Sequence, residues 1–371
     1  MNGTAADGPL LRRETSGQPG AGGEIRILLL ADTHLGLDAP LRPRVERRRR
    51  GDDFYANYLA ALQPALDGQA DLVVHGGDMF FRSRVHPAIV ESAFAPLLQI
   101  ADLGVPICIV PGNHERGNLP RSLLESHARI HIFDHARTFL FTLRGRRLAL
   151  AGFPNLRENA RDRFAGEVEK TEWMSCQADL GLLCMHQAVE GAQVGVQNYT
   201  FRGGEDVIRG RDIPAGFQAV LSGHIHRYQV LTRDLAGRRL NAPVFYPGSI
   251  ERTSFAEREE QKGFLIIELA AEGGVRHRFM PLPARPMVDL DLTGWGSDAG
   301  LVGERLLREF AQLDENAIVR IHSADPAAGA LMGALNDRWL RSAAPKTMNI
   351  GWSYSSRASG DSPGEASSQP F

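Results

Sequence analysis

The sequence predicts an α/β fold: a layered β-sandwich flanked by helices, followed by a small α+β module. Two observations predict these layers. Short aliphatic runs recur along the chain and each ends in a polar cluster, as buried strands do when they end beside a ligand. Between the first three runs, apolar residues recur at helical spacing, so strands and helices alternate.

Seven aliphatic runs are each predicted to form a strand that ends in polar residues. They are 25–34, 71–78, 106–115, 146–154, 179–187, 217–226 and 242–249. Helices are predicted at 55–66 and 90–101, where apolar residues follow the i, i+3, i+4, i+7 pattern. Because α/β sheets bind ligands at the carboxyl ends of their strands, we expect the polar clusters to meet at one edge.

The later part of the chain changes character twice. The runs 263–270 and 275–282 follow each other without a long helix, which favours a second, more antiparallel sheet packed on the first. Beyond the prolines at 283 and 286, strand and helix patterns alternate again, which predicts a separate module. We expect a main domain over 25–283, a small module over 284–350, and disordered, Ser/Gly/Pro-rich tails at 1–24 and 351–371.

Composition narrows the class of protein. The chain of 371 residues carries 42 Lys and Arg against 44 Asp and Glu, so no overall positive field draws polyanions to it. Its three cysteines have no C-x-x-C spacing, which favours a reducing compartment. No apolar run approaches the length of a membrane span. A cytoplasmic enzyme without a membrane segment is expected.

The polar clusters contain the side chains of a two-metal site. Imidazole, carboxylate and amide groups are ligands for divalent ions, and here they are Asp32, His34, Asp78, Asn113, His186, His224 and His226, with His114 beside them. Two ions ~3.5 to 4 Å apart can hold an in-line displacement at phosphorus, and Asp78 is the candidate bridge. Alternate residues of an extended strand face the same side, so Asp32 with His34, and His224 with His226, are expected to point together.

Other histidines are predicted to be structural or exposed rather than metal ligands. His127, His131 and His135 would share a helix face, but the aliphatic residues around His131 predict a short strand, which removes that face. His75 lies inside a predicted strand and is expected to be a buried, hydrogen-bonded residue.

Five motifs carry a resemblance to a known family. In order, "ADTHLG", "HGGDMF", "PGNHE", "MHQ" and "SGHIH" resemble the motifs of the calcineurin-like metallophosphoesterases. Within them, "FYPGSIERTSFAEREEQKGFLIIEL" and "FRGGEDVIRGRDIPAGFQAVLSGHIH" resemble the SbcD-type DNA repair exonucleases. The likeness implies a metallophosphoesterase-type fold with a nuclease domain over 25–283 and a capping domain over 284–350. It also implies a two-metal-dependent DNA exonuclease in DNA repair or DNA end processing.

The resemblance also implies roles for the motif residues. One metal is then held by Asp32, His34 and His226, the other by Asn113, His186 and His224, with Asp78 shared. Manganese is the usual metal of these nucleases, although Mg²⁺, Fe²⁺, Zn²⁺ and Co²⁺ suit the same donors. A metal-bridging hydroxide attacks phosphorus, while His114 stabilises charge or protonates the leaving 3′ oxygen. The catalytic residues are thus His114 and Asp78, and Glu115 is expected to orient His114.

Two departures from the family pattern bear on this reading. Many of these nucleases have His or Asp three residues after the bridging Asp, where this chain has Phe81. Longer members follow the capping domain with an amphipathic segment that docks on an SMC-like, SbcC-type ATPase, and no such segment is evident here. The ATPase partner therefore stays open, and a homodimer is expected from the family alone.

Basic stretches are candidates for contacts with a DNA backbone. The run "RPRVERRRR", residues 42–50, includes Arg47, Arg48, Arg49 and Arg50. A second set, Arg202, Arg209 and Arg211, lies between the fourth and fifth motifs. The alternative for the run at 42–50 is an ordinary solvated charge cluster at the start of a helix.

Two other functions compete with the nuclease reading. A small-substrate metallophosphoesterase, either a cyclic-nucleotide phosphodiesterase or a phosphomonoesterase, would use the same centre and suits the near-neutral charge. A scaffold without activity would lack some of the motif residues, yet the sequence contains all of them.

Overall fold

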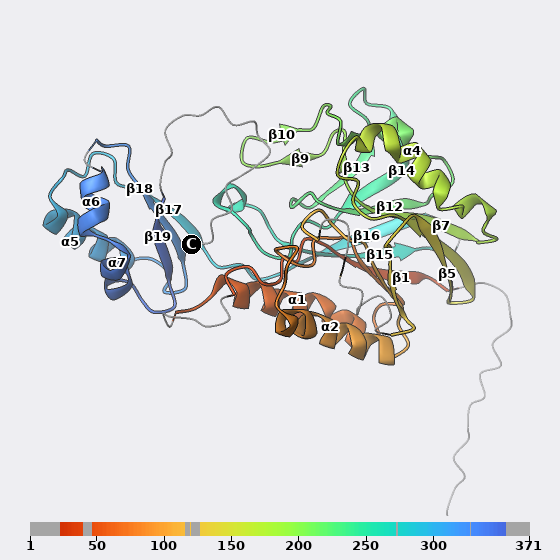
Figure 1. Ribbon diagram of the computed structural model, residues 1–371, viewed down its shortest axis with the longest axis horizontal. Helices are drawn as coiled ribbons and strands as arrows, with labels where there is room; N and C mark the ends of the chain where they lie inside the picture. The colour runs from red at the N-terminus through yellow and green to blue at the C-terminus, as the bar shows by residue number, and fades with distance from the viewer. Residues whose placement is uncertain are drawn as a thin grey trace, which may run out of the picture.

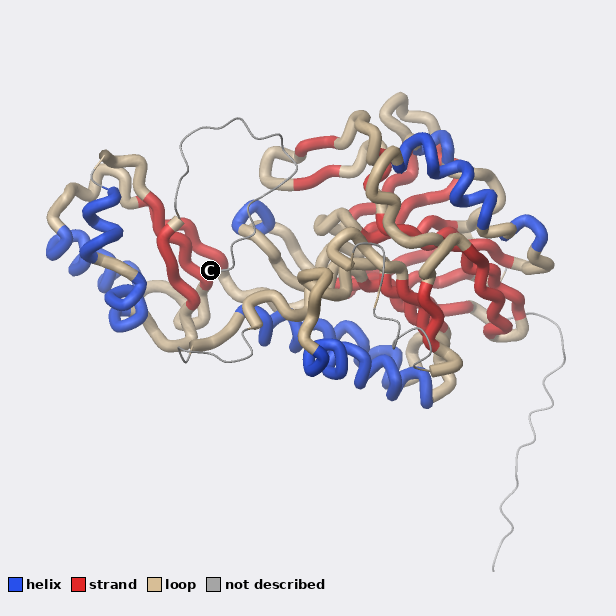
Figure 2. The backbone as a smooth tube through the Cα atoms, viewed as in Figure 1, coloured by secondary structure: helices blue, strands red, loops and turns tan. Residues whose placement is uncertain are grey.

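The computed structural model describes residues 23–39, 47–115, 119, 127–271, 274–326 and 328–353. Their main body consists of two six-stranded sheets packed face to face, with helices on both outer faces (Figure 1, Figure 2). This arrangement confirms the predicted layered α/β sandwich. Most of the two predicted disordered tails, and residues 42–46 of the basic run, lie outside the described residues.

The first sheet is parallel at one side and antiparallel at the other. In spatial order its strands are β16 (Val275–Pro281), β15 (Gly263–Leu269), β1 (Ile25–Leu30), β2 (Leu72–His75), β3 (Ile107–Ile109) and β4 (Ile130–Ile132). The expectation that β15 and β16 belong to a second sheet is wrong. β15 pairs antiparallel with β1 instead, with Ile27 opposite Ile267, and so covers an edge of β1 that would otherwise be open.

The second sheet is mostly parallel, which also differs from the expectation. In spatial order its strands are β13 (Gln229–Arg233), β14 (Arg239–Tyr246), β12 (Ala219–Gly223), β7 (Leu180–His186), β6 (Arg146–Gly152) and β5 (Arg137–Leu143). The inner four run parallel, and only the edge strands β13 and β5 are antiparallel. Both edge strands escaped prediction because half-exposed strands lack a continuous aliphatic run.

The predicted helices form on the outer face of the first sheet. α1 (Arg50–Leu66) and α2 (Pro87–Asp102) cover that face, and α4 (Ala160–Lys170) covers the second sheet. In α1 the buried side includes Tyr58 and Leu62. Tyr55 and Leu59 belong to the predicted stripe but are exposed, because the buried stripe runs through Phe54 and Ala61 instead. No helix in the described ranges is long and apolar enough to cross a membrane.

Short elements complete the main body. They are β8 (Ala188–Val189), β9 (Gln193–Val194), β10 (Tyr199–Thr200), β11 (Val207–Ile208) and the 3-10 turns Trp173–Ser175, Gly210–Asp212 and Phe255–Glu257. β9 and β10 form a hairpin, and β8 pairs with β11.

The side chains of β1 show how the layers are held together. Ile27 and Leu29 point into the core between the sheets, against Leu150, Leu182 and other residues of the second sheet. Leu28 points the other way, into the core beneath α1 and α2. Because both faces of the strand are buried, its sequence is a continuous aliphatic run rather than an alternating one.

Residues 287–352 form a smaller module with its own sheet and core. Its elements are β17 (Met287–Asp291), α5 (Ala299–Phe310), β18 (Ile318–His322), α6 (Ala328–Ala334), α7 (Asp337–Ala343) and β19 (Asn349–Trp352). The strands pair parallel in the order β17, β18, β19, and Leu306, Phe310 and Leu340 pack among the core residues. In Figure 1 the module lies at one end of the long axis, beyond the N-terminal end of α1.

A buried arginine fastens the module to the main body. Arg285 forms an ion pair of 2.8 Å with Asp53 of α1, and both side chains are buried. The same guanidinium donates to Asn349 Oδ1 and to the carbonyl of Asn316. A buried charge that loses its partner is costly, so these bonds hold the module in a defined position against α1.

We expect the core between the sheets to dominate stability. Leu182→Ala removes a fully buried side chain and should cost about 2 to 5 kcal/mol of unfolding free energy, while Leu140→Ala, at a side chain 58% exposed, should change it by less than about 0.5 kcal/mol. Urea unfolding of both variants measures the difference. Equal losses would mean that the two sheets do not pack as described.

Candidate metal centre

The motif residues lie at the carboxyl ends of strands from both sheets. The first sheet supplies Asp32 and His34 after β1, Asp78 after β2, and Asn113 and His114 after β3. The second sheet supplies His186 as the last residue of β7, and His224 and His226 after β12. The structure therefore brings together the residues that the sequence singled out, and the centre lies where the two sheets meet.

Three of these side chains form one possible ligand group. The ligand atoms of Asp32, His34 and His226 lie within 4.8 Å of one another. Nε2 of His34 and Nε2 of His226 face each other at 3.1 Å, and His226 Nε2 is 3.8 Å from Asp32 Oδ1. Burial, and next the charge of His226, holds the pKa of His34 well below its usual value. A neutral imidazole that faces another imidazole and a carboxylate fits a cation between them.

A second group is built around the amide of Asn113. Asn113 Oδ1 lies 3.0 Å from His186 Nε2 and 3.0 Å from His224 Nδ1. His186 Nδ1 donates to the carbonyl of Gly76 at 2.8 Å, because a carbonyl can only accept. That bond fixes the ring so that Nε2 points into the centre, which is how backbone carbonyls orient metal-binding histidines.

Asp78 lies between the two groups. Its Oδ2 is 3.4 Å from His186 Nε2 and 3.8 Å from His114 Nε2, and its Oδ1 accepts from the backbone N–H of His114 at 2.8 Å. Asp78 also shares one cluster with Asp32 and His186, and another with His34 and His114. Its position suits a carboxylate that serves both groups.

The charged groups of the centre shift one another's pKa values. Burial raises the pKa of Asp32 to about 6. Burial would also raise the pKa of Asp78, but the charge of His186 and its hydrogen bond outweigh it and hold that pKa below its usual range. Burial would lower the pKa of His186, yet Asp78 outweighs it and raises that pKa to about 9. The buried carboxylates thus require positive charge, so a divalent cation that binds here displaces a proton.

The backbone around the ligands is unusual. Asp32, His34, Asp78 and His224 have φ values of 51°, 42°, 51° and 82°, in the left-handed region that non-glycine residues avoid. The expectation that extended strands present these side chains in pairs is therefore wrong, because β1 and β12 end before them. Tight turns turn the side chains inward instead, and such strain is typical of functional sites.

His114 is held by an unexpected partner. Its Nδ1 donates to the carbonyl of Phe81 at 2.7 Å, which leaves Nε2 facing Asp78, and the side chain is 34% exposed. The ring of Phe81 lies near the rings of His114 and His34, with centroids 5.9 and 6.2 Å away. Position 81 therefore orients His114 through its backbone, although its side chain has no proton to exchange.

Glu115 hydrogen-bonds to the backbone of two loops, the one after β2 and the one after β3, and not to the ring of His114. Its carboxylate accepts from the backbone N–H of Phe80 at 2.7 Å and of Gly112 at 2.8 Å, and burial raises its pKa to about 8. These bonds join the loop after β2 to the loop after β3. Its effect on His114 is thus indirect, through the backbone.

Sequence reasoning missed a buried charge cluster behind His226. His226 Nδ1 lies 2.9 Å from Glu257 Oε1, and the fully buried Lys262 reaches Glu257 Oε2 at 2.8 Å. Lys262 also binds Glu260 at 2.9 Å and the carbonyl of His226 at 2.8 Å. The only signal in the sequence was a lysine directly before the aliphatic run of β15. The cluster fixes the His226 ring with Nε2 toward the centre.

The structure confirms His75 as a buried, hydrogen-bonded residue and His131 as part of a strand. His75 Nε2 lies 3.0 Å from Thr33 Oγ1 and its Nδ1 accepts from the N–H of Gly77, while burial lowers its pKa to about 3. His131 lies in strand β4, so it shares no helix face with His127 and His135.

The four described arginines of the basic run, residues 47–50, have intramolecular partners. Arg47 and Arg49 pair with Asp38 at 3.2 and 3.3 Å. Arg48 pairs with Asp53 and donates to Asn316 Oδ1 of the C-terminal module, both at 2.7 Å. Arg50 is 4% exposed and donates to the carbonyl of Arg252. A run of like charge in a sequence does not reveal such distant acidic partners. The DNA contact stays a prediction.

Comparison with known proteins decides the family. A family model of calcineurin-like phosphoesterases matches residues 25–228. The chain belongs to the calcineurin-like phosphoesterase family. That span includes every strand-end motif described above.

Individual proteins resemble this phosphoesterase over a longer span. The DNA double-strand break repair protein Mre11 of Haloferax volcanii is 28% identical over 336 residues, which cover 84% of this chain and 67% of that protein. The protein of the same name from Archaeoglobus fulgidus is 25% identical over 330 residues, 80% of this chain and 68% of that protein. Among solved structures, a dimetal phosphatase from Danio rerio aligns with a TM-score of 0.43 and 11% identity, over 68% of this chain and 98% of that one.

The buried cluster behind His226 generates a prediction about metal binding. Glu257→Gln keeps the shape but removes the charge that orients the His226 ring, so Mn²⁺ affinity should fall by about 10- to 100-fold. Glu259→Gln is the matched control, because that side chain is 81% exposed. Calorimetric titration with Mn²⁺ measures both, and equal affinities in the two variants would show that Glu257 does not support the centre.

Proposed function

We propose that this phosphoesterase is a metal-dependent DNA nuclease that shortens DNA from an end, in DNA repair or end processing. The observation that carries the proposal is the meeting of all the motif side chains at one centre between the sheets. The similarity to two proteins named as DNA double-strand break repair proteins, over more than three quarters of this chain, supports DNA as the substrate.

The proposed assignment gives each ion its own group of ligands. Asp32, His34 and His226 would hold one ion, and Asn113, His186 and His224 the other, with Asp78 contributing to both. The facing nitrogens of His34 and His226 and the shared position of Asp78 support this division. Mixed imidazole and oxygen donors suit Mn²⁺, which we propose as the working metal, and they also accept Mg²⁺, Fe²⁺, Zn²⁺ and Co²⁺.

The chain's own residues then perform the remaining chemistry. When bound, divalent ions supply Lewis acidity to the phosphoryl oxygens and acidify water. His114 Nδ1 is committed to the Phe81 carbonyl, so Nε2 is the atom that can give a proton to a leaving oxygen or donate a hydrogen bond to a phosphoryl oxygen. The partial exposure of its side chain leaves it within reach of a substrate.

The proposal extends to domain roles and partners. We propose a nuclease domain over 25–283 and a capping domain over 284–350, consistent with the separate sheet and core of the module. DNA is the proposed substrate. A homodimer, an SbcC-type ATPase partner and a cytoplasmic location are proposed from the resemblance and the composition.

The substrate class is tested by comparing three phosphate esters. End-labelled duplex DNA, a small phosphodiester and a phosphomonoester are incubated with the full chain, with and without Mn²⁺. We expect Mn²⁺-dependent shortening of the DNA. Intact DNA together with hydrolysis of the small esters would overturn the proposal and identify a small-substrate phosphoesterase.

The metal content of two variants distinguishes the proposed role of His114 from that of Asp78. His114→Ala should retain both ions yet lose about 10²- to 10⁴-fold in rate, because it removes only a proton-handling group. Asp78→Ala should lose metal as well as activity. Metal analysis by mass spectrometry alongside the DNA assay measures both, and equal metal content in the two variants would contradict the bridging role of Asp78.

A further inference from the structure

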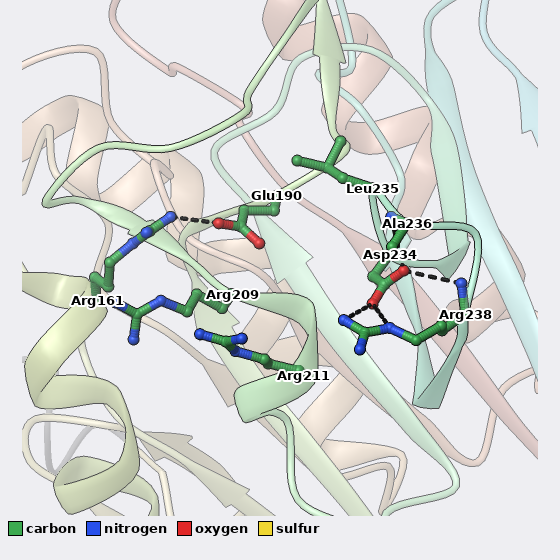
Figure 3. Close-up of a pocket in the computed structure, with 8 residues that line it drawn as sticks. All are labelled: Arg161, Glu190, Arg209, Arg211, Asp234, Leu235, Ala236 and Arg238. Carbon is green, nitrogen blue, oxygen red and sulfur yellow. Dashed lines mark hydrogen bonds and ion pairs between the residues drawn. The ribbon is translucent and has the colours of Figure 1, made fainter.

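A pocket rich in arginine lies beside the second sheet (Figure 3), and none of the candidate metal ligands lines it. The start of α4, the loop after β8, the turn Gly210–Asp212 and the turn between β13 and β14 form its walls. Its volume is about 230 Å³, and its charged lining consists of Arg161, Arg209, Arg211, Arg238, Glu190 and Asp234. The mechanism proposed above uses none of these residues.

Two of the arginines are balanced by carboxylates within the pocket. Arg161 Nη2 binds Glu190 Oε1 at 2.5 Å, and Arg238 Nη2 binds Asp234 Oδ2 at 2.8 Å. These two pairs stand on opposite sides of the pocket in Figure 3. Each pair is electrically neutral and stabilises one wall of the pocket. The positive charge of the pocket therefore comes from the other two arginines, Arg209 and Arg211.

Arg209 and Arg211 lie between these pairs with donors to spare (Figure 3). They share one carboxylate, Asp212, at 3.6 and 3.8 Å, which is too long for a good hydrogen bond. Neither guanidinium forms a hydrogen bond with another of the described residues. Two planar sets of N–H donors therefore border the cavity. The two positive charges of Arg209 and Arg211 are only partly neutralised by the single negative charge of Asp212.

The pocket extends away from the metal centre. β12 and β14 run parallel with Val220 opposite Val244, so His224 follows the carboxyl end of β12 while Asp234 and Arg238 precede the start of β14. About ten residues separate His224 from this wall along the strand direction, or roughly 30 Å at the usual rise per residue. The wall at Glu190 is nearer, because Glu190 follows His186 by four residues, but none of the candidate metal ligands lines the pocket.

We propose that this pocket binds a phosphorylated anion through Arg209 and Arg211. A guanidinium presents paired donors that match two oxygens of a phosphoryl group, and two adjacent guanidiniums suit one or two such groups. The phosphoryl group belongs either to a free ligand such as a nucleotide or to a DNA backbone, since the recognition chemistry is the same. The proposal does not depend on the nuclease function.

Inorganic pyrophosphate is the probe for the pocket. The metal-loaded full chain is titrated by calorimetry, so that any binding at the metal centre is common to every variant. Arg209→Ala with Arg211→Ala should weaken pyrophosphate binding at the pocket at least tenfold. Arg163→Ala with Arg233→Ala is the control, because it removes the same charge from exposed side chains on neighbouring α4 and β13 that do not line the pocket.

A second double variant distinguishes the effect of positive charge from the effect of the paired guanidinium donors. It also keeps the test valid if the alanine variant misfolds. Arg209→Lys with Arg211→Lys keeps both charges but loses the paired donors, and its affinity should fall between wild type and the alanine variant. Equal pyrophosphate affinity in the alanine variant and the control overturns the proposal, whatever the DNA result.

A short DNA duplex identifies the source of the phosphoryl group. If the alanine variant also binds DNA more weakly, with a salt slope reduced by about two, the pocket holds a DNA backbone. If it loses pyrophosphate but binds DNA like the control, the pocket holds a free phosphorylated ligand. Either result supports the site.

Discussion

The close approach of the two sheets at their carboxyl ends is the constraint on which the metal centre depends. Glycines make it possible, because a Cβ on Gly77 would overlap the imidazole of His186 and a Cβ on Gly223 would overlap the carbonyl of Gly76. Within the first sheet, a Cβ on Gly112 would likewise overlap the carboxylate of Asp78. Since Asp78 comes from the first sheet and His186 from the second, any separation of the sheets would divide the ligands. The aliphatic core between the sheets is thus also the support of the centre.

Backbone geometry and hydrogen bonds together position the side chains of the centre. Left-handed backbone at Asp32, Asp78 and His224 costs free energy, which the surrounding packing has to offset. Behind the ligands, the carbonyl of Gly76 orients His186 and Glu257 orients His226. Ligands held in this way lose little freedom when an ion binds, so affinity and geometry are set before binding.

Much of the fold, and the meeting of the candidate ligands at one centre, could be predicted from the sequence, since buried strands and their polar ends leave a strong local pattern. The pairing of strands left no such pattern. The aliphatic run of β15, for example, does not show that its partner strand is β1. The turns at Asp32 and His224 were misjudged because polar residues directly after a strand look like its continuation. The arginine run at 47–50 was ambiguous, as its partners Asp38 and Asp53 are recognisable only in three dimensions. Lys262 was missed because a lysine is rarely buried.

The proposal that Asp78 joins two ions across the sheets is tested most directly by electron paramagnetic resonance of the chain titrated with Mn²⁺. Two ions that share a carboxylate ~3.5 to 4 Å apart interact magnetically. We expect a spectrum of coupled Mn²⁺ that grows until two equivalents are bound and is lost in Asp78→Ala. Saturation at one equivalent, or two ions that each give the six-line spectrum of isolated Mn²⁺, would contradict a shared centre.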